Sequence, residues 1–149
     1  MKILSKSLQD TEKTAKEFLE KISRSLGRPQ GKAALVVGLF GDLGSGKTTF
    51  VQILGRDLDI KEVMTSPTFV LEKIYLLNGE KGFKKLIHID AYRLESGKEL
   101  LNLGIEEILK DPGNLILIEW PERVADVLPK DLLKVSFKFI KEFEREITF

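Results

Sequence analysis

The stretch that most constrains the fold of this chain spans residues 35–50 and reads LVVGLFGDLGSGKTTF. An apolar run typical of a strand ends in a glycine-rich turn, which leads directly into a segment with helical spacing. The pattern G-x-x-x-x-G-K-[ST] is matched by Gly41, Gly46, Lys47 and Thr48. Glycines let backbone N–H groups face phosphate oxygens, because no Cβ stands in the way. The stretch therefore predicts a phosphate-binding loop, against the alternative of a chance glycine-rich turn.

The motif predicts a role for each side chain of the loop. Lys47 is expected to reach the β- and γ-phosphates as a point charge, and Thr48 to ligate Mg²⁺ through its hydroxyl. The N-terminus of the following helix adds partial positive charge. The residues expected to bind the nucleotide are Gly41, Asp42, Leu43, Gly44, Ser45, Gly46, Lys47, Thr48 and Thr49.

Composition limits the class of protein. With 149 residues, 42% of them hydrophobic, the chain is expected to form one domain, residues 1–149, with a real core. The 24 Lys and Arg residues are balanced by 23 Asp and Glu residues, so the chain lacks the excess of positive charge that is typical of nucleic-acid-binding proteins. Any RNA is therefore expected to be held by a partner. The absence of cysteine excludes disulfides and Cys-ligated zinc. No run approaches the roughly 18 apolar residues of a membrane span, so we expect a soluble, cytoplasmic protein without a membrane contact.

Apolar periodicity predicts alternating helices and strands. In the first half these are an amphipathic helix over 11–26, a strand buried on both faces over 33–40, a helix after Lys47, and an antiparallel hairpin of 69–77 and 84–90. In the second half they are a helix opened by a capping box at Ser96, a short helix over 105–110, an apolar strand over 115–118, and an antiparallel pair over 132–149 at the sheet edge.

Two carboxylates end apolar runs and are candidates for the acidic part of a phosphate site. Asp90 ends LIHID and Glu119 ends LILIE, and polar groups at strand ends meet at the ligand-binding edge of an open α/β sheet. Spacing alone does not rank the two. We favour Glu119 as the Mg²⁺ ligand, because its uniformly apolar run is typical of a central strand next to the loop strand. Asp90 follows an edge-like hairpin and is expected to position water. A strand-end or capping acid is the alternative for either residue.

Five further residues have open assignments. His88 is the only histidine, which excludes a multi-histidine metal site and favours a supporting hydrogen bond. Tyr92 and Trp120 either stack on a base or a partner or belong to the core. Arg93 and Arg123 either neutralise charge on the γ-phosphate or form surface ion pairs.

The segment 61–69 reads KEVMTSPTF and carries three hydroxyls around Pro67, at Thr65, Ser66 and Thr68. Proline keeps this backbone out of the middle of a helix. The residues alone favour a polar turn that leads into a strand. The alternative is a switch segment, in which a hydroxyl near the γ-phosphate or its Mg²⁺ moves on hydrolysis.

Four blocks stand in a fixed order: GDLGSGKTTF at 41–50, SPTF at 66–69, HIDAYRL at 88–94 and IEWPE at 118–122. Together they closely resemble the bacterial TsaE (YjeE) family of tRNA threonylcarbamoyladenosine biosynthesis ATPases. The resemblance implies an α/β fold, a single P-loop NTPase domain whose parallel central strands are flanked by antiparallel strands, with helices on both faces.

The same resemblance implies a function and its residues. It implies a Mg²⁺-dependent ATPase that acts with TsaB and TsaD in forming N6-threonylcarbamoyladenosine at position 37 of tRNA, with ATP hydrolysis supporting turnover and tRNA contacted only through the complex. By position, Lys47 and Thr48 carry over as phosphate and Mg²⁺ ligands, Thr68 as a switch hydroxyl, and Asp90 and Glu119 as the acidic pair needed for hydrolysis. The catalytic residues are therefore expected to be Lys47, Thr68, Asp90 and Glu119.

Two other classes of function stay open. A small-molecule kinase needs a mobile lid with several arginines, whereas the one sizeable insertion, NGEKGFKK at 78–85, has lysines and no arginine. A nucleotide-dependent docking module would act through its bound state, with little turnover. No NKxD-like base-reading motif occurs, which favours ATP over GTP.

Overall fold

The fold is described from a computed structural model over residues 1–24, 33–65 and 71–149. Its centre is a seven-stranded sheet in the order β1-β7-β6-β2-β5-β4-β3. The strands are β1 (Lys2–Ser5), β2 (Leu35–Phe40), β3 (Glu72–Leu76), β4 (Lys85–Asp90), β5 (Asn114–Glu119), β6 (Leu133–Lys141) and β7 (Glu144–Thr148). The helices are α1 (Leu8–Arg24), α2 (Lys47–Asp57), α3 (Lys98–Asn102), α4 (Ile105–Lys110) and the 3-10 helix η1 (Pro121–Val124).

The four central strands β6, β2, β5 and β4 run parallel to one another. Every residue of β5 is buried, as expected for a strand that is apolar on both faces. Antiparallel strands flank this parallel set, with β3 beside β4 on one side and β7 and then β1 beyond β6 on the other. The predicted α/β sheet is confirmed.

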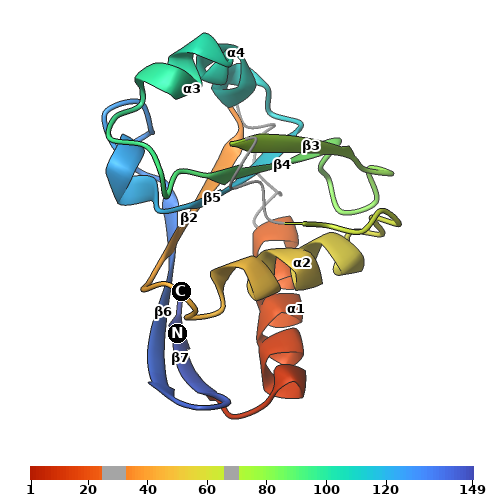
Figure 1. The fold of residues 1–149 in the computed structure, drawn as a ribbon. Coiled ribbons are helices and arrows are strands. Elements are labelled where there is room, and N and C mark those ends of the chain that lie inside the picture. The colour runs from red at the N-terminus through yellow and green to blue at the C-terminus, as the bar shows by residue number, and fades with distance from the viewer. Residues whose placement is uncertain (25–32, 66–70) are drawn as a thin grey trace.

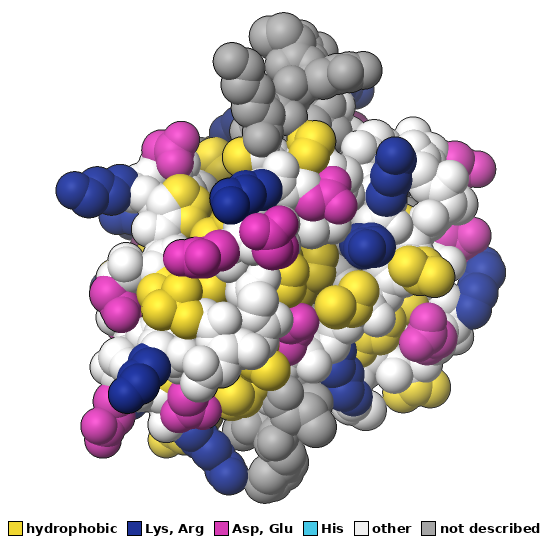
Figure 2. Space-filling model, turned by 90° about the horizontal axis from the view of Figure 1, so that it is seen from above, with side chains coloured by type: hydrophobic (Ala, Val, Ile, Leu, Met, Phe, Trp, Pro, Cys, Tyr) yellow, Lys and Arg dark blue, Asp and Glu magenta, His cyan; other side chains and the backbone are white. Residues whose placement is uncertain are grey.

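Helices cover both faces of the sheet, as predicted (Figure 1). On one face, α1 and α2 bury an aromatic cluster in which Phe50 lies 5.8 Å from Phe18 and 5.3 Å from Phe137, between ring centroids. On the other face, α3, α4 and η1 pack through Leu100, Ile105 and Val124. On the surface seen from above α3 and α4, positive and negative side chains are interspersed, in keeping with the balanced net charge (Figure 2).

The predicted edges of the sheet need correction. The predicted edge pair, β6 and β7, lies inside the sheet, because β1 pairs antiparallel with β7 and forms the edge itself. A strand of four residues is too short for its periodicity to be read from the sequence. The hairpin that ends at Asp90 does lie at the opposite edge, where β3 is the last strand, but β4 itself pairs with both β5 and β3 and is buried from Leu86 to Asp90.

Two helix starts also differ from prediction. The helix predicted from residue 11 begins at Leu8, where the hydroxyl of Ser7 accepts a hydrogen bond from the Asp10 N–H at 3.1 Å. No capping box opens α3: its cap is Gly97, whose N–H donates to the carboxylate of Asp126 at 2.9 Å. Asp126, which is remote in sequence, thus fixes the residue before α3, and local spacing cannot indicate this contact. None of the helices in the described ranges has the length and apolar character needed to cross a membrane.

Candidate functional site

The loop between β2 and α2 has the conformation that its glycines predict. Gly46 caps α2 with φ 106°, a left-handed backbone that side chains rarely adopt. A Cβ at this position would also collide with Nη1 of Arg145. The first turn of α2 presents backbone N–H groups without partners in the helix, which together with the helix dipole favour an anion.

A cleft of about 430 Å³ opens over this loop. The loop and α2 contribute Leu43, Gly44, Gly46, Lys47, Thr48 and Thr49. Strand ends and neighbouring turns contribute Asp90, Tyr92, Arg93, Glu119, Trp120 and Arg145. Of the other predicted nucleotide ligands, Gly41 and Asp42 accept hydrogen bonds from Lys47 through their backbone carbonyls, and Ser45 is buried.

Lys47 is folded into its own loop. Its Nζ donates to the carbonyl oxygens of Gly41 at 2.6 Å and of Asp42 at 2.8 Å, and the residue is only 4% exposed. Burial lowers the pKa of this ammonium, and the nearby carboxylates, Glu119 first among them, partly oppose that shift. Within residues 1–24, 33–65 and 71–149, no carboxylate lies within ion-pair distance of it. Its charge is therefore available to an anion in the cleft.

Glu119 is held by hydrogen bonds on both carboxylate oxygens. The hydroxyl of Thr48 donates to Oε1 at 2.8 Å, and Nε2 of His88 lies 2.7 Å from Oε2. Both Glu119 and His88 are buried, so each satisfies a polar group that would otherwise be costly to bury. The predicted supporting role of His88 thus has a definite contact, and the carboxylate joins β5 to the start of α2.

Asp90 lies beside Glu119 at the carboxyl edge of the sheet. The two residues are opposite each other in the parallel register of β4 and β5, and Asp90 is 6% exposed. Its Oδ1 accepts a hydrogen bond from the Tyr92 N–H at 2.9 Å, which fixes the turn that follows β4. Both predicted carboxylates therefore reach the same cleft as the phosphate loop.

The oxygen ligands at this edge fit Mg²⁺. The Thr48 hydroxyl and the Glu119 carboxylate are in contact, and Asp90 is on the adjacent strand end. In the parts of the chain that the structure describes, no group of three or more His, Cys, Asp or Glu side chains could enclose a metal. Mg²⁺ commonly binds through one or two carboxylates together with waters and substrate phosphates, so this sparse set suits it.

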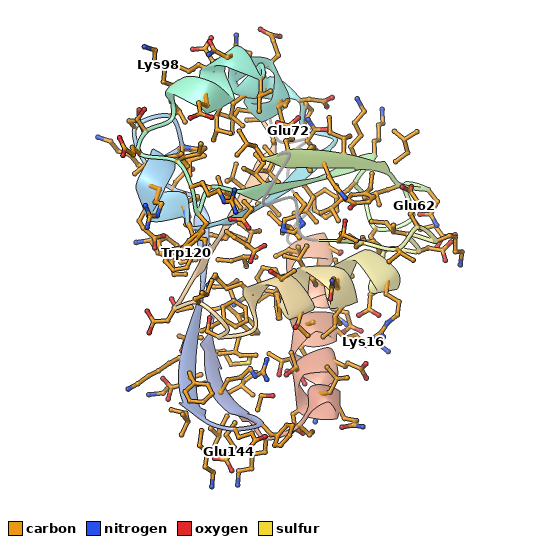
Figure 3. All side chains as sticks on the ribbon, viewed as in Figure 1. Lys16, Glu62, Glu72, Lys98, Trp120 and Glu144 are labelled. Carbon is orange, nitrogen blue, oxygen red and sulfur yellow. The ribbon has the colours of Figure 1, made fainter. Side chains whose placement is uncertain are left out.

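An aromatic pair forms one wall of the cleft. Trp120 lies at the start of η1 (Figure 3). Its ring centroid lies 5.1 Å from that of Tyr92 and 4.4 Å from the ammonium of Lys47. Arg123 stacks on the outside of this pair, 5.5 Å from the Tyr92 ring, and does not line the cleft. Arg93 does line it. Of the two arginines considered for the γ-phosphate, the structure therefore brings only Arg93 to the cleft.

One predicted residue lies outside this geometry, and one residue of the cleft was not predicted. Thr68, and with it the segment 66–69, lies outside the described residues. Arg145 lines the cleft from β7, although nothing in the local pattern EREIT distinguishes it from a surface arginine. Only the order of the strands could have identified it.

Comparison with known proteins gives a consistent result. The model of the family described as threonylcarbamoyl adenosine biosynthesis protein TsaE matches residues 5–147. A relative named tRNA threonylcarbamoyladenosine biosynthesis protein TsaE from Treponema pallidum is 36% identical over 99% of this chain and 98% of its own length. A protein of the same name from Bacillus subtilis is 39% identical over 76% of this chain and 68% of its own length. The solved structure of Bacillus subtilis YdiB superposes with a TM-score of 0.70 at 28% identity, covering 99% of this chain and 82% of that one. With this sheet, this loop and these relatives, the chain belongs to the TsaE family.

Proposed function

We propose that this chain is a Mg²⁺-dependent ATPase that supports formation of N6-threonylcarbamoyladenosine at position 37 of tRNA, acting with the TsaB and TsaD subunits. The observation that carries the ATPase part is the contact of the Thr48 hydroxyl with the Glu119 carboxylate at 2.8 Å, in the cleft that also holds Lys47. It joins a phosphate loop to an acidic residue in one site. The names of the relatives, together with membership of the TsaE family, support the pathway.

Binding of the triphosphate follows from the loop. Backbone N–H groups of residues 43–49, including those at the N-terminus of α2, donate hydrogen bonds to the phosphate oxygens, and Lys47 exchanges its carbonyl partners for the β- and γ-phosphates. Thr48 and Glu119 would hold Mg²⁺, which would neutralise charge on the phosphate oxygens, and their contact at 2.8 Å supports this assignment. His88 keeps the Glu119 carboxylate in this orientation.

Hydrolysis requires an oriented water. Asp90, on the strand next to Glu119, orients the water and accepts its proton as the oxygen attacks the terminal phosphorus. The bond to the bridging oxygen breaks, and ADP and phosphate are the products. Arg93 neutralises charge that develops on the terminal phosphate. We assign Thr68 a switch role in the same step, by its position in the SPTF block.

The assembly follows from charge and family. Since Lys and Arg are balanced by Asp and Glu, we propose that tRNA is held by the TsaB and TsaD complex and not by this chain directly, and that the complex works in the cytoplasm.

The test is ATP hydrolysis by the purified chain, alone and with TsaB and TsaD, with Lys47→Ala as the control. Slow hydrolysis that rises with the pair and is lost in the variant is the expected result. A rate of ATP hydrolysis that is unchanged by TsaB and TsaD but rises with a small metabolite would indicate a kinase. Nucleotide-dependent binding to the pair without turnover would make it a docking module.

A further inference from the structure

Arg145 reaches the phosphate loop from the C-terminal strand. It lies on β7, opposite Phe139 of β6 and Ser5 of β1. Residues two apart on a strand share a face, so Arg145 shares the face of Ile147, which is buried in the core under α1 and α2. Its Cζ would lie 3.3 Å from a Cβ at Gly46, so the guanidinium lies against the last glycine of the loop.

The loop is packed closely on β6 and β7 as a whole. In Figure 1 the turn between β2 and α2 lies beside these two strands. A Cβ at Gly41 would meet the backbone carbonyl of Phe137 on β6, just as one at Gly46 would meet Arg145 on β7. The backbone of the neighbouring strand β6 is therefore held against the loop, and Arg145 reaches Gly46 through its side chain.

The charge of Arg145 is not neutralised by its neighbours in sequence. Glu144 pairs with Lys141 at 3.3 Å, and Glu146 pairs with Lys2 at 3.0 Å. Among residues 1–24, 33–65 and 71–149, no carboxylate lies within ion-pair distance of its guanidinium. The guanidinium faces a loop that presents backbone N–H donors and Lys47. Positive groups gathered in this way repel one another unless an anion binds between them.

The strand order shows which part of that anion it faces. The loop strand β2 lies between β5 and β6. Glu119 and Asp90 end β5 and β4 on one side of it, and Arg145 comes from β7 on the other. In the proposed ATPase, Thr48 and Glu119 would hold Mg²⁺, which would neutralise charge on the terminal phosphates, so the terminal phosphate is expected on the acidic side. The α-phosphate then faces β6 and β7.

We propose that Arg145 binds the α- and β-phosphates of the nucleotide. The proposal rests on the proposed ATP binding. The planar guanidinium carries a permanent charge and can donate two hydrogen bonds to phosphate oxygens. Because ATP and ADP share these two phosphates, Arg145 contributes equally to the affinity for both, and it acts on substrate binding and product release and not on cleavage of the terminal bond.

The test compares Mg-ATP and Mg-ADP dissociation constants, by calorimetry, for the wild type, Arg145→Gln and Arg145→Lys. Arg145→Gln is expected to weaken both nucleotides by the same factor, roughly 10- to 100-fold, because it removes a charge-assisted hydrogen bond. In hydrolysis, KM should rise while kcat stays within about threefold. Arg145→Lys keeps the charge without the planar fork and should fall between the wild type and Arg145→Gln.

Arg24→Gln is the matched control, since Arg24 lies on the last turn of α1, pairs with Glu20 at 3.6 Å and is far more exposed. It should leave both dissociation constants unchanged, and thermal unfolding should verify that each variant is folded. Weaker ATP binding with unchanged ADP binding would overturn the proposal by placing Arg145 at the terminal phosphate. Unchanged affinity for both would also overturn it, while leaving the proposed function intact. A folded wild type that binds neither nucleotide would refute the proposed function itself, and this inference with it.

Discussion

The two sides of the cleft are built in different ways. On the side of β4 and β5, Asp90 and Glu119 are almost fully buried, and the Glu119 carboxylate is fixed on both oxygens by Thr48 and His88. On the side of β7, Arg145 is half-buried on an antiparallel strand near the edge of the sheet, without a carboxylate at ion-pair distance in the described ranges.

This difference has a physical reason. A carboxylate can be buried only with hydrogen-bond partners, and those partners also fix its direction. A half-exposed arginine keeps part of its hydration and can remain without a protein partner until an anion arrives. We therefore expect the buried side to decide the rate of chemistry and the exposed side to decide affinity.

The largest effect is expected from a substitution on the buried side of the cleft, at Glu119. Glu119→Gln keeps the shape of the side chain and removes its charge, and we expect hydrolysis to fall roughly 10²- to 10⁴-fold while ADP still binds in the absence of Mg²⁺. Single-turnover hydrolysis and ADP affinity with and without Mg²⁺ measure this.

Asp90→Asn is the matched variant and separates the two carboxylates. It should reduce hydrolysis by a similar factor but keep the Mg²⁺ dependence of ADP affinity, since Asp90 is proposed to act on water. If Asp90→Asn abolished that dependence and Glu119→Gln preserved it, the metal would belong to Asp90.

The next largest effect is expected at Lys47, in the loop between the two sides of the cleft. Lys47→Ala removes the cation nearest the β- and γ-phosphates, and we expect the dissociation constant of ATP to rise roughly 100-fold. Arg56→Ala, which removes a surface charge paired with Glu12, is the control and should leave the constant unchanged. An ATP affinity that survived Lys47→Ala would remove the loop lysine from the site.

A smaller effect is expected from removing His88, the side chain that holds one oxygen of the Glu119 carboxylate. His88→Ala leaves one carboxylate oxygen without its partner, and loss of such a supporting contact typically weakens metal binding about 10- to 100-fold. The Mg²⁺ concentration that gives half-maximal hydrolysis should rise accordingly. His88→Gln retains a donor at this distance and should recover part of the loss. Equal Mg²⁺ requirements for the wild type and His88→Ala would show that His88 serves packing alone.

The smallest effect concerns Glu72 on β3, a partly buried carboxylate whose Oε2 has no hydrogen-bond partner among the described residues. Burial raises its pKa above the ordinary 4.5. Between pH 4.5 and the higher pKa of Glu72 in the folded state, the folded protein binds more protons than the unfolded chain. The free energy of unfolding therefore falls as pH rises through that range. Thermal unfolding from pH 4 to 8 should show this fall for the wild type and a shallower one for Glu72→Gln. Parallel curves would mean that the Glu72 carboxylate is solvated.

The parts of the site that were predicted correctly share one property. The glycine turn between β2 and α2, the buried strand before it and the strand-end positions of Asp90 and Glu119 all follow from patterns within a few residues. The features that were missed depend on residues far apart in sequence. The strand β1 is defined by its pairing with β7, and Gly97 at the start of α3 is held by the carboxylate of Asp126.

The sequence by itself determined the loop, its lysine and threonine, and two carboxylates for the same edge of an α/β sheet, because glycine conformation and apolar periodicity act locally. Only the tertiary structure decided that His88 and Thr48 hold Glu119 between them, and that Arg145 faces the loop from the opposite side. Both depend on strand order and register, which are set by packing over the whole chain.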